Sequence, residues 1–277
     1  MFFAKWIDQA LLGQEFVNGR WHVHSVFKQS LNLQDQSKQQ LLMITAQELH
    51  FPKGIVVAPT DYLLMAKELS AETVIMIQQR VIHFPKHSLS FQESVHSDTH
   101  WQAEANAFDP QAFWSTLDLI TKMTGYHEML NQVTSSQQSF CLAIDQLCDL
   151  SFRRQRQGVS YLLGRGIGLT PTGDDMLVGH LFARLVMDRK DLRLTTYLDR
   201  KLKSLHDLTT DVSRHYLINA LEESFNQTTL SLVESLTREE YQSVIKRILE
   251  LGHTSGADFL AGFARSIHCF QQKRNEE

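Results

Sequence analysis

Residues 164–179 read GRGIGLTPTGDDMLVG, a glycine-rich loop that runs directly into a helix. Thr172 is a suitable N-cap residue, and Asp175 falls at the third helical position, which predicts a Thr-x-x-Asp variant of the capping box. Free N–H groups and the positive dipole end at such a helix start favour an anion. The glycines of the loop allow the backbone to approach that anion closely.

Residues 253–262, HTSGADFLAG, repeat the pattern. Both stretches fit Ser/Thr-Gly-x-Asp-x-Leu-x-Gly, so the match predicts two equivalent helix-loop units related by a pseudo-twofold. Gly179 and Gly262 would let the two helices pack closely, and the arrangement would bring two helix starts and two carboxylates towards one pocket. A single copy is typical of ordinary helix packing, whereas two copies favour a ligand site.

The spacing of apolar residues is helical from about Pro110 to the end of the chain. We expect helices over 109–123, 137–155, 174–188, 195–208, 213–225, 239–252 and 257–272. Strand-helix alternation does not recur along the chain, which argues against a doubly wound parallel sheet.

The N-terminal part is rich in β-branched and aromatic residues separated by polar, Gly or Pro breaks. It predicts strands over 21–27, 41–45, 54–58, 73–77 and 80–84, one helix over 60–69, and a strand or two between 88 and 109. The expected fold class is therefore α+β. A β-rich N-terminal domain, residues 1–109, packs on a helical C-terminal domain, residues 110–277, which carries the two glycine-rich helix starts.

Composition narrows the function classes. The chain has 277 residues, 43% of them hydrophobic, and a net charge of -4 from 27 basic and 31 acidic residues. No global basic field is available to hold a nucleic-acid backbone. Charged residues interrupt the apolar N-terminus, and no uncharged apolar run is long enough to span a bilayer, so we expect neither a signal peptide nor a membrane span, and a cytoplasmic protein. Three cysteines form no disulfide framework or zinc pattern.

The glycine loop lacks the Lys-Ser/Thr of a Walker site and follows a helix, which disfavours a Rossmann site as well. No nucleophile elbow is present, so covalent catalysis is not indicated. Magnesium remains a candidate cofactor, because Asp174 and Asp175 with Asp258 as third ligand offer the oxygen atoms that it prefers; the metal ligands themselves are not assigned.

Two segments carry a resemblance to a known family. Residues 166–175, with the pattern Gly-x-Gly-Leu-Thr-Pro-x-x-Asp-Asp, and residues 251–258, Leu-Gly-His-Thr-Ser-Gly-Ala-Asp, look like the two signature segments of the AllH family. The strand-rich region from residue 25 to 33 and the turn at 51–54 are similar to the family's N-terminal part. The resemblance spans most of the chain.

This resemblance implies a subunit of oxamate carbamoyltransferase, a multi-subunit enzyme of allantoin (purine) catabolism that uses phosphate to split oxalurate into oxamate and carbamoyl phosphate. Its expected partners are the other subunits and small carboxylate and phosphate ligands. The alternatives are a non-catalytic assembly or ligand-sensing subunit and, less favoured, a magnesium-dependent hydrolase. No catalytic residue is transferred from the family.

Local physics assigns the candidate roles. Helix-start N–H groups would bind phosphate and the oxyanion, Arg165 would bind the substrate carboxylate, and His253 would move a proton or polarise a carbonyl. The candidate catalytic residues are His253, Asp175 and Asp258. The candidate substrate-binding residues are Arg165, Gly166, Gly168, Thr170, Thr172, Gly173, Asp174, Thr254, Ser255 and Gly256.

Overall fold

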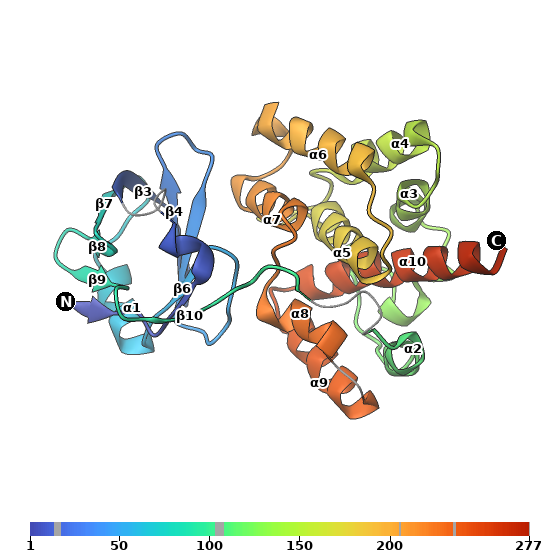
Figure 1. Cartoon of the computed structure of the whole chain (residues 1–277), viewed down its shortest axis with the longest axis horizontal. Helices are drawn as coiled ribbons and strands as arrows, with labels where there is room; N and C mark the ends of the chain where they lie inside the picture. Colours follow the sequence, from blue (N-terminus) through green and yellow to red (C-terminus); the bar gives the residue numbers. More distant parts are fainter. Residues whose placement is uncertain (14–17, 103–107, 205, 235–236, 277) are drawn as a thin grey trace. The chain divides into compact units, whose positions relative to one another are not determined.

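The computed structural model describes residues 1–13, 18–102, 108–204, 206–234 and 237–276. The chain divides into two compact units (Figure 1). The first comprises Met1–His100 with Ser224–Gln227, and the second comprises Trp101–Glu223 with Thr228–Glu277.

Strands dominate the first unit. Within the described residues, ten of them form one mixed sheet in the order β1-β9-β8-β7-β3-β4-β5-β6-β2-β10. Their bounds are β1 Phe2–Phe3, β2 Trp6–Asp8, β3 Asn18–Val26, β4 Ser30–Asp35, β5 Leu41–Thr45, β6 Gly54–Val56, β7 Val74–Gln78, β8 Val81–His83, β9 Ser88–Ser90 and β10 Val95–Ser97.

The sheet curls back on itself at its first two strands. Ala4 donates its N–H to Ser90 O at 2.9 Å, and the next residue, Lys5, donates to Val56 O at 2.8 Å. β1 therefore pairs with one end of the strand order while β2 pairs near the other. One short N-terminal segment thus joins both ends of the sheet.

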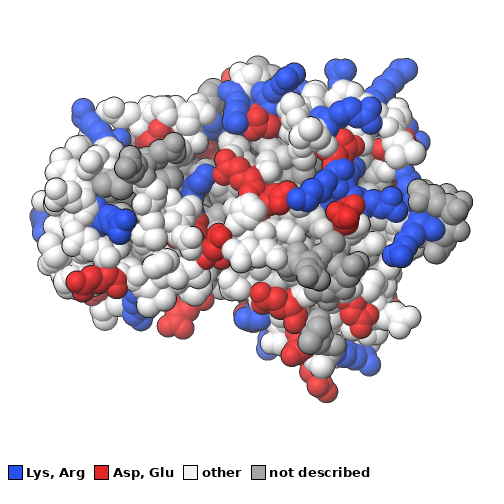
Figure 2. Space-filling view, viewed as in Figure 1, with Lys and Arg blue, Asp and Glu red and all other residues white. Residues whose placement is uncertain are grey.

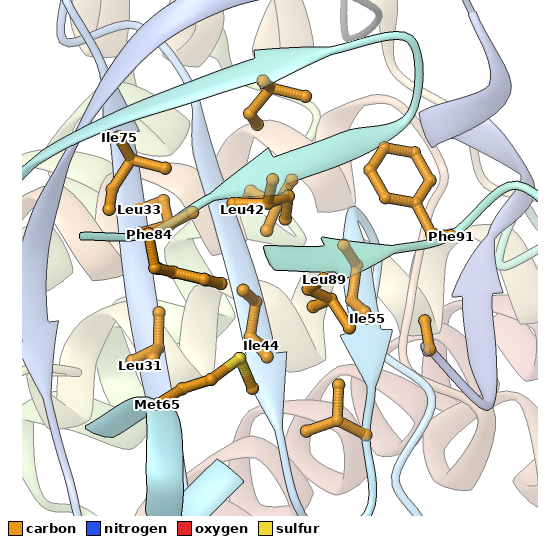
Figure 3. Packing of buried hydrophobic residues seen from close by; sticks show 14 of the residues in the cluster. Leu31, Leu33, Leu42, Ile44, Ile55, Met65, Ile75, Phe84, Leu89 and Phe91 are labelled. Carbon is orange, nitrogen blue, oxygen red and sulfur yellow. The ribbon is translucent and has the colours of Figure 1, made fainter. Parts of the chain in front are cut away.

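The curled sheet encloses an apolar core (Figure 3). Inward-facing residues alternate along the strands, as Leu31 and Leu33 on β4 and Leu42 and Ile44 on β5 illustrate, and all four are completely buried. α1, Pro59–Ala66, adds Met65 and other apolar side chains to the same cluster. Burial of this surface is the main source of stability for the unit.

Helices form the second unit. Their bounds are α2 Pro110–Leu117, α3 Ser139–Leu147, α4 Phe152–Leu162, α5 Thr172–Val186, α6 Leu192–Ser204, α7 Asp211–Leu221, α8 Gln227–Glu234, α9 Arg238–Leu249 and α10 Ser255–Glu276. Short 3₁₀ turns occur at Gln9–Leu12, Leu130–Gln132 and His206–Leu208.

α5 lies at the centre of the helical unit and packs along α10 (Figure 1). Every residue of α5 except Val178 is buried, as expected of a helix that is covered on all sides. No helix in the described part of the chain is long and apolar enough to cross a membrane. On the face shown in Figure 2, acidic and basic side chains are interspersed, so this face carries no continuous basic stripe.

The predicted α+β class is confirmed, with strands up to residue 97 and helices from residue 110. The one helix predicted over 137–155 is wrong, because the chain forms α3 and α4 with a turn between them. Asp149 accepts the N–H of Ser151 at 2.8 Å in that turn, so a side chain replaces the continuing helical bonds. β1, β2 and α8 were not predicted, because β1 and β2 are very short and α8 is largely polar, and β4 was expected only through the family resemblance of residues 25–33.

Candidate functional site

Two helix-loop-helix units of the same build meet in the helical unit. α4 leads into α5 through residues 163–171, and α9 leads into α10 through residues 250–254. Each loop turns at a glycine with positive φ, Gly164 at 72° and Gly252 at 61°. This left-handed conformation is typical just after a helix end. The repeated motif of the sequence therefore corresponds to a repeated local structure.

A second glycine in each unit brings the new helix against the end of the previous one. A Cβ added to Gly173 would lie 2.0 Å from Leu162 O, and a Cβ added to Gly256 would lie 1.8 Å from Ile248 O. Both distances are too short for any side chain. The motif glycines are thus required for packing in the same way in both units.

The third pair of motif glycines lies where α5 and α10 cross. A Cβ added to Gly179 would lie 2.1 Å from Phe259 O, and a Cβ added to Gly262 would lie 2.1 Å from Met176 O. Met176 and Phe259 each directly follow the motif aspartate of their own helix. The contact is therefore reciprocal, which confirms the predicted close, pseudo-twofold packing of the two helices.

Hydroxyl and carboxyl groups are exchanged between the two helix starts. Thr172 donates its hydroxyl to Asp258 Oδ2 at 3.1 Å. The Ser255 hydroxyl in turn forms a hydrogen bond with Asp175, and it lies 2.7 Å from the Thr170 hydroxyl. The two helix starts therefore face each other, as the duplicated motif predicted.

Asp258 is completely buried, and its carboxylate is held by protein groups. Gly125 donates its N–H to Oδ1 at 2.7 Å, and the hydroxyls of Thr172 and Thr254 also bond to the carboxylate. Burial raises the pKa of Asp258, and these hydrogen bonds counteract part of that rise. Asp258 thus connects the turn at Gly125 to both helix starts.

Asp175 is buried in the first turn of α5, and its Oδ2 has no hydrogen-bond partner among the described residues. Burial raises its pKa well above the ordinary value, the nearby Asp258 raises it further, and the hydroxyls of Ser255 and Thr170 oppose the rise. On α7, burial and then the charge of Asp175 raise the pKa of Tyr216 to about 12. A buried acceptor without a donor is rare in folded proteins and needs an explanation.

Asp174 anchors the glycine loop. Gly164 donates its N–H to Oδ1 at 2.7 Å, Ser213 donates its hydroxyl to Oδ2 at 2.7 Å, and Thr209 donates to the same oxygen. Burial raises the pKa of Asp174. Among the described residues, no three His, Cys, Asp or Glu side chains are grouped as a metal site. Both oxygens of Asp174 therefore already have protein donors.

The predicted capping box at α5 is wrong. Thr172 is the first helical residue, Pro171 occupies the N-cap position without a side-chain cap, and the Thr172 hydroxyl goes to the other helix. Three helix-start N–H groups expected to be free are also occupied: Gly173 donates to Arg165 O at 2.8 Å, Asp174 to Pro171 O at 2.9 Å, and Gly256 to Leu251 O at 3.1 Å. Close packing of each loop on its helix start accounts for both corrections.

The remaining candidate residues lie on the exposed side of the loops. Arg165 is exposed, its guanidinium lies 4.1 Å from the centre of the Tyr161 ring, and its Nε donates to Tyr161 O at 2.6 Å. Gly166 and Gly168 are exposed with φ of 130° and 92°, and His253 is exposed in the second loop. These groups are accessible to a ligand.

Several residues of the site were not found from the sequence. Gly125 lies in a turn closed by Thr124, which accepts the N–H of His127 at 3.1 Å, and Ser213, Thr209 and the α7 residue Tyr216 surround the two aspartates of α5. The only signal in the sequence was the Thr-Gly pair at 124–125, which indicates a turn but not its partner.

A cavity of about 790 Å³ lies near the far ends of α5 and α10, lined by Gln155, Arg184, Asp191 and Lys273 among others. Two of its polar side chains bond to the protein: Arg184 donates to Leu147 O at 2.9 Å, and Gln155 Nε2 donates to Asp191 at 2.7 Å, while Gln155 Oε1 has no partner among the described residues. We therefore assign the candidate site to the helix starts.

Comparison with protein families gives two matches. Residues 162–267 match the family described as oxamate carbamoyltransferase subunit AllH, and residues 3–97 match the AllH family N-terminal domain. The first match contains both helix starts. No solved structure matches the chain. Because the two matches together cover most of its length, the chain belongs to the AllH family of oxamate carbamoyltransferase subunits.

Proposed function

We propose that this chain contributes the helix-start site to a cytoplasmic, multi-subunit oxamate carbamoyltransferase of allantoin (purine) breakdown. The proposed reaction transfers the carbamoyl group of oxalurate to phosphate and yields oxamate and carbamoyl phosphate. A phosphate oxygen bonds to the carbamoyl carbon, the bond from that carbon to the oxamate nitrogen breaks, and the nitrogen takes up a proton. The other subunits of the enzyme are its proposed partners.

The exposed loop groups and the buried acids suit different parts of this reaction. Arg165 carries the positive charge proposed for the substrate carboxylate, and a planar guanidinium fits a carboxylate well. The glycine loop offers backbone that phosphate can approach, and His253 is an exposed imidazole for proton transfer. Asp258, held by three protein groups, connects the two helix starts.

The observation that carries the proposal is the buried Asp175 Oδ2 without a hydrogen-bond partner, inside the segment that matches the carbamoyltransferase subunit family. A purely structural carboxylate at this position would gain stability from a donor on both oxygens. An unfilled acceptor is instead what a site that awaits a ligand would present.

The test is steady-state kinetics of the assembled enzyme containing Asp175→Asn, Arg165→Ala or His253→Ala. We expect kcat/KM for phosphate-dependent oxalurate cleavage to fall by roughly a hundredfold in each variant. Asp199→Asn, at an exposed i,i+4 pair on α6, is the matched control and should retain full activity. Full activity in all three loop and helix-start variants would contradict the proposal.

One observation favours the alternative of a non-catalytic assembly subunit. Ile167 and Leu169, on the glycine loop, are 92% and 45% exposed, and such apolar side chains suit contact with another subunit. The two proposals differ in ligand binding: a ligand site predicts a rise in melting temperature with oxamate or phosphate. An assembly role predicts no rise, together with loss of subunit association in Ile167→Asp.

A further inference from the structure

The two halves of the helix-start pair differ in one contact. Asp258 binds a peptide N–H, that of Gly125, at 2.7 Å. Asp175, its equivalent in the duplicated motif, has an Oδ2 without any hydrogen-bond partner in the described part of the chain. The same hydroxyl and carboxyl exchange surrounds both acids. In one half the carboxyl group therefore receives a peptide N–H of the protein itself, and in the other half one buried carboxyl oxygen has no donor among the described residues.

The contact between Gly125 and Asp258 shows which kind of group binds beside a motif aspartate. The peptide at Gly125 fits closely, since a Cβ there would lie 2.2 Å from Thr172 Oγ1 and 2.8 Å from Asp258 Oδ2. Only a flat amide without a side chain fits at this place. The contact is a hydrogen bond from a neutral N–H to a buried carboxyl group, which is short at 2.7 Å.

Electrostatics disfavour an anionic group beside Asp175. The Asp258 carboxyl group already acts on it, and burial strengthens repulsion between like charges. A carboxylate or phosphate oxygen at Oδ2 would add a third negative group. A neutral amide avoids this repulsion, and it pairs with a carboxyl group in either protonation state, because it offers both an N–H and a carbonyl oxygen.

We propose that Asp175 Oδ2 binds the N–H of an amide, ureide or carbamoyl group of the ligand, and that the contact between Gly125 and Asp258 is its internal counterpart. This assignment rests on the proposed function, because it takes the helix starts as a ligand site. It adds to that function the chemical group of the ligand that Asp175 binds. It does not require this chain to perform the transfer.

The test uses two probes that differ only in the N–H. N-methyloxamate carries it, and monomethyl oxalate has an ester oxygen in its place. Isothermal titration calorimetry of the full-length chain should show N-methyloxamate binding about ten- to a hundredfold more tightly, the ratio expected for one hydrogen bond to a buried carboxyl group. Asp199→Asn, the exposed control on α6, should keep that ratio.

Asp175→Leu keeps the branched shape without either oxygen and should bring the ratio of the two dissociation constants close to one. Asp175→Asn preserves the shape and serves if the leucine variant does not fold. Its amide can donate to the ester oxygen or accept from the N–H, so the ratio should fall well below that of the wild type. A wild-type ratio near one, no binding of either probe, or a wild-type ratio that persists in the folded variants would overturn the assignment.

Activity separates this assignment from the proposed function. An assembled enzyme that transfers carbamoyl groups, containing a chain that binds both probes equally, would contradict only the role of Asp175. A chain that discriminates between the probes, in an enzyme whose activity is unaffected by the helix-start variants, would contradict only the catalytic proposal.

Discussion

Thr172, the first residue of α5, donates its hydroxyl to Asp258 in the first turn of α10, 86 residues further along the chain. The same hydroxyl would satisfy an N–H of its own helix in an ordinary capping box. Here the hydroxyl of Thr172 bonds to the other helix instead, and Ser255 acts on Asp175 in the opposite direction. The two helix starts are therefore linked by side chains in both directions.

The glycines at the crossing of α5 and α10 should be intolerant of alanine. Gly179→Ala and Gly262→Ala each place a methyl group about 2 Å from backbone oxygen of the other helix, so we expect each to lower the free energy of unfolding by about 2–4 kcal/mol. Urea denaturation measures this loss. Gly13→Ala, where the new Cβ meets its nearest atom at 3.4 Å, is the control and should change little.

The two crossing substitutions should also be non-additive. Both push apart the same pair of helices, so the double variant should lose less stability than the sum of the single losses. Strict additivity would mean that the two glycines belong to independent contacts.

The raised pKa of Asp175 predicts a pH dependence of stability. The folded state holds its proton more tightly than the unfolded state, so the stabilising contribution is complete below the unfolded pKa, about 4, and is lost as pH rises through the folded pKa. Asp175→Asn stays neutral throughout. Its stability relative to wild type should therefore increase above pH 4, by at most about 1.4 kcal/mol per pH unit.

Thermal unfolding from pH 4 to 8 measures this difference, with Asp199→Asn as the exposed carboxyl control. A difference between wild type and Asp175→Asn that does not change with pH would show that Asp175 ionises normally in the folded protein.

Arg265 on α10 holds α3 and the chain that follows the Gly125 turn. Its guanidinium makes two bonds to Asp145, at 2.7 and 2.6 Å, and donates to Val133 O at 3.0 Å. Lysine carries the same charge but cannot make the paired hydrogen bonds of a planar guanidinium to a carboxylate. We therefore expect Arg265→Lys to lower the free energy of unfolding by about 2 kcal/mol.

The matched control is Arg154→Lys at the surface pair with Asp149, where Arg154 is 55% exposed. There the loss should be below about 1 kcal/mol. Urea denaturation measures both losses of stability. Equal losses at the two arginines would mean that the buried pair of Arg265 and Asp145 contributes no more to stability than a surface ion pair.

The sequence predicted the features that rest on local patterns. The amphipathic spacing after Pro110 predicted the helices. The crossing of α5 and α10 was predicted from Gly179 and Gly262, which lie at the same distance from the motif aspartate in each helix and let the two helix backbones come close at that point. The β-branched residues of 41–45 and 73–77, set between polar breaks, predicted β5 and β7.

Contacts between distant residues could not be predicted. The sequence pattern of Thr172 and Asp175 is the same whether they cap their own helix or bond across the pair, and only the tertiary packing decides. Gly125 reaches Asp258 across 133 residues. β1 and β2 have two and three residues, too few for alternation to be visible, and are held by bonds to strands from elsewhere in the chain.

A double-mutant cycle tests the exchange between the helix starts most directly. Thr172→Val and Asp258→Asn, combined and separate, should show a coupling energy of about 1 kcal/mol or more in urea denaturation, because their side chains share a hydrogen bond. Thr172→Val with Asp175→Asn should show a clearly smaller coupling. The reverse order, strong coupling of Thr172 to Asp175 and none to Asp258, would restore the ordinary capping box and contradict the paired site.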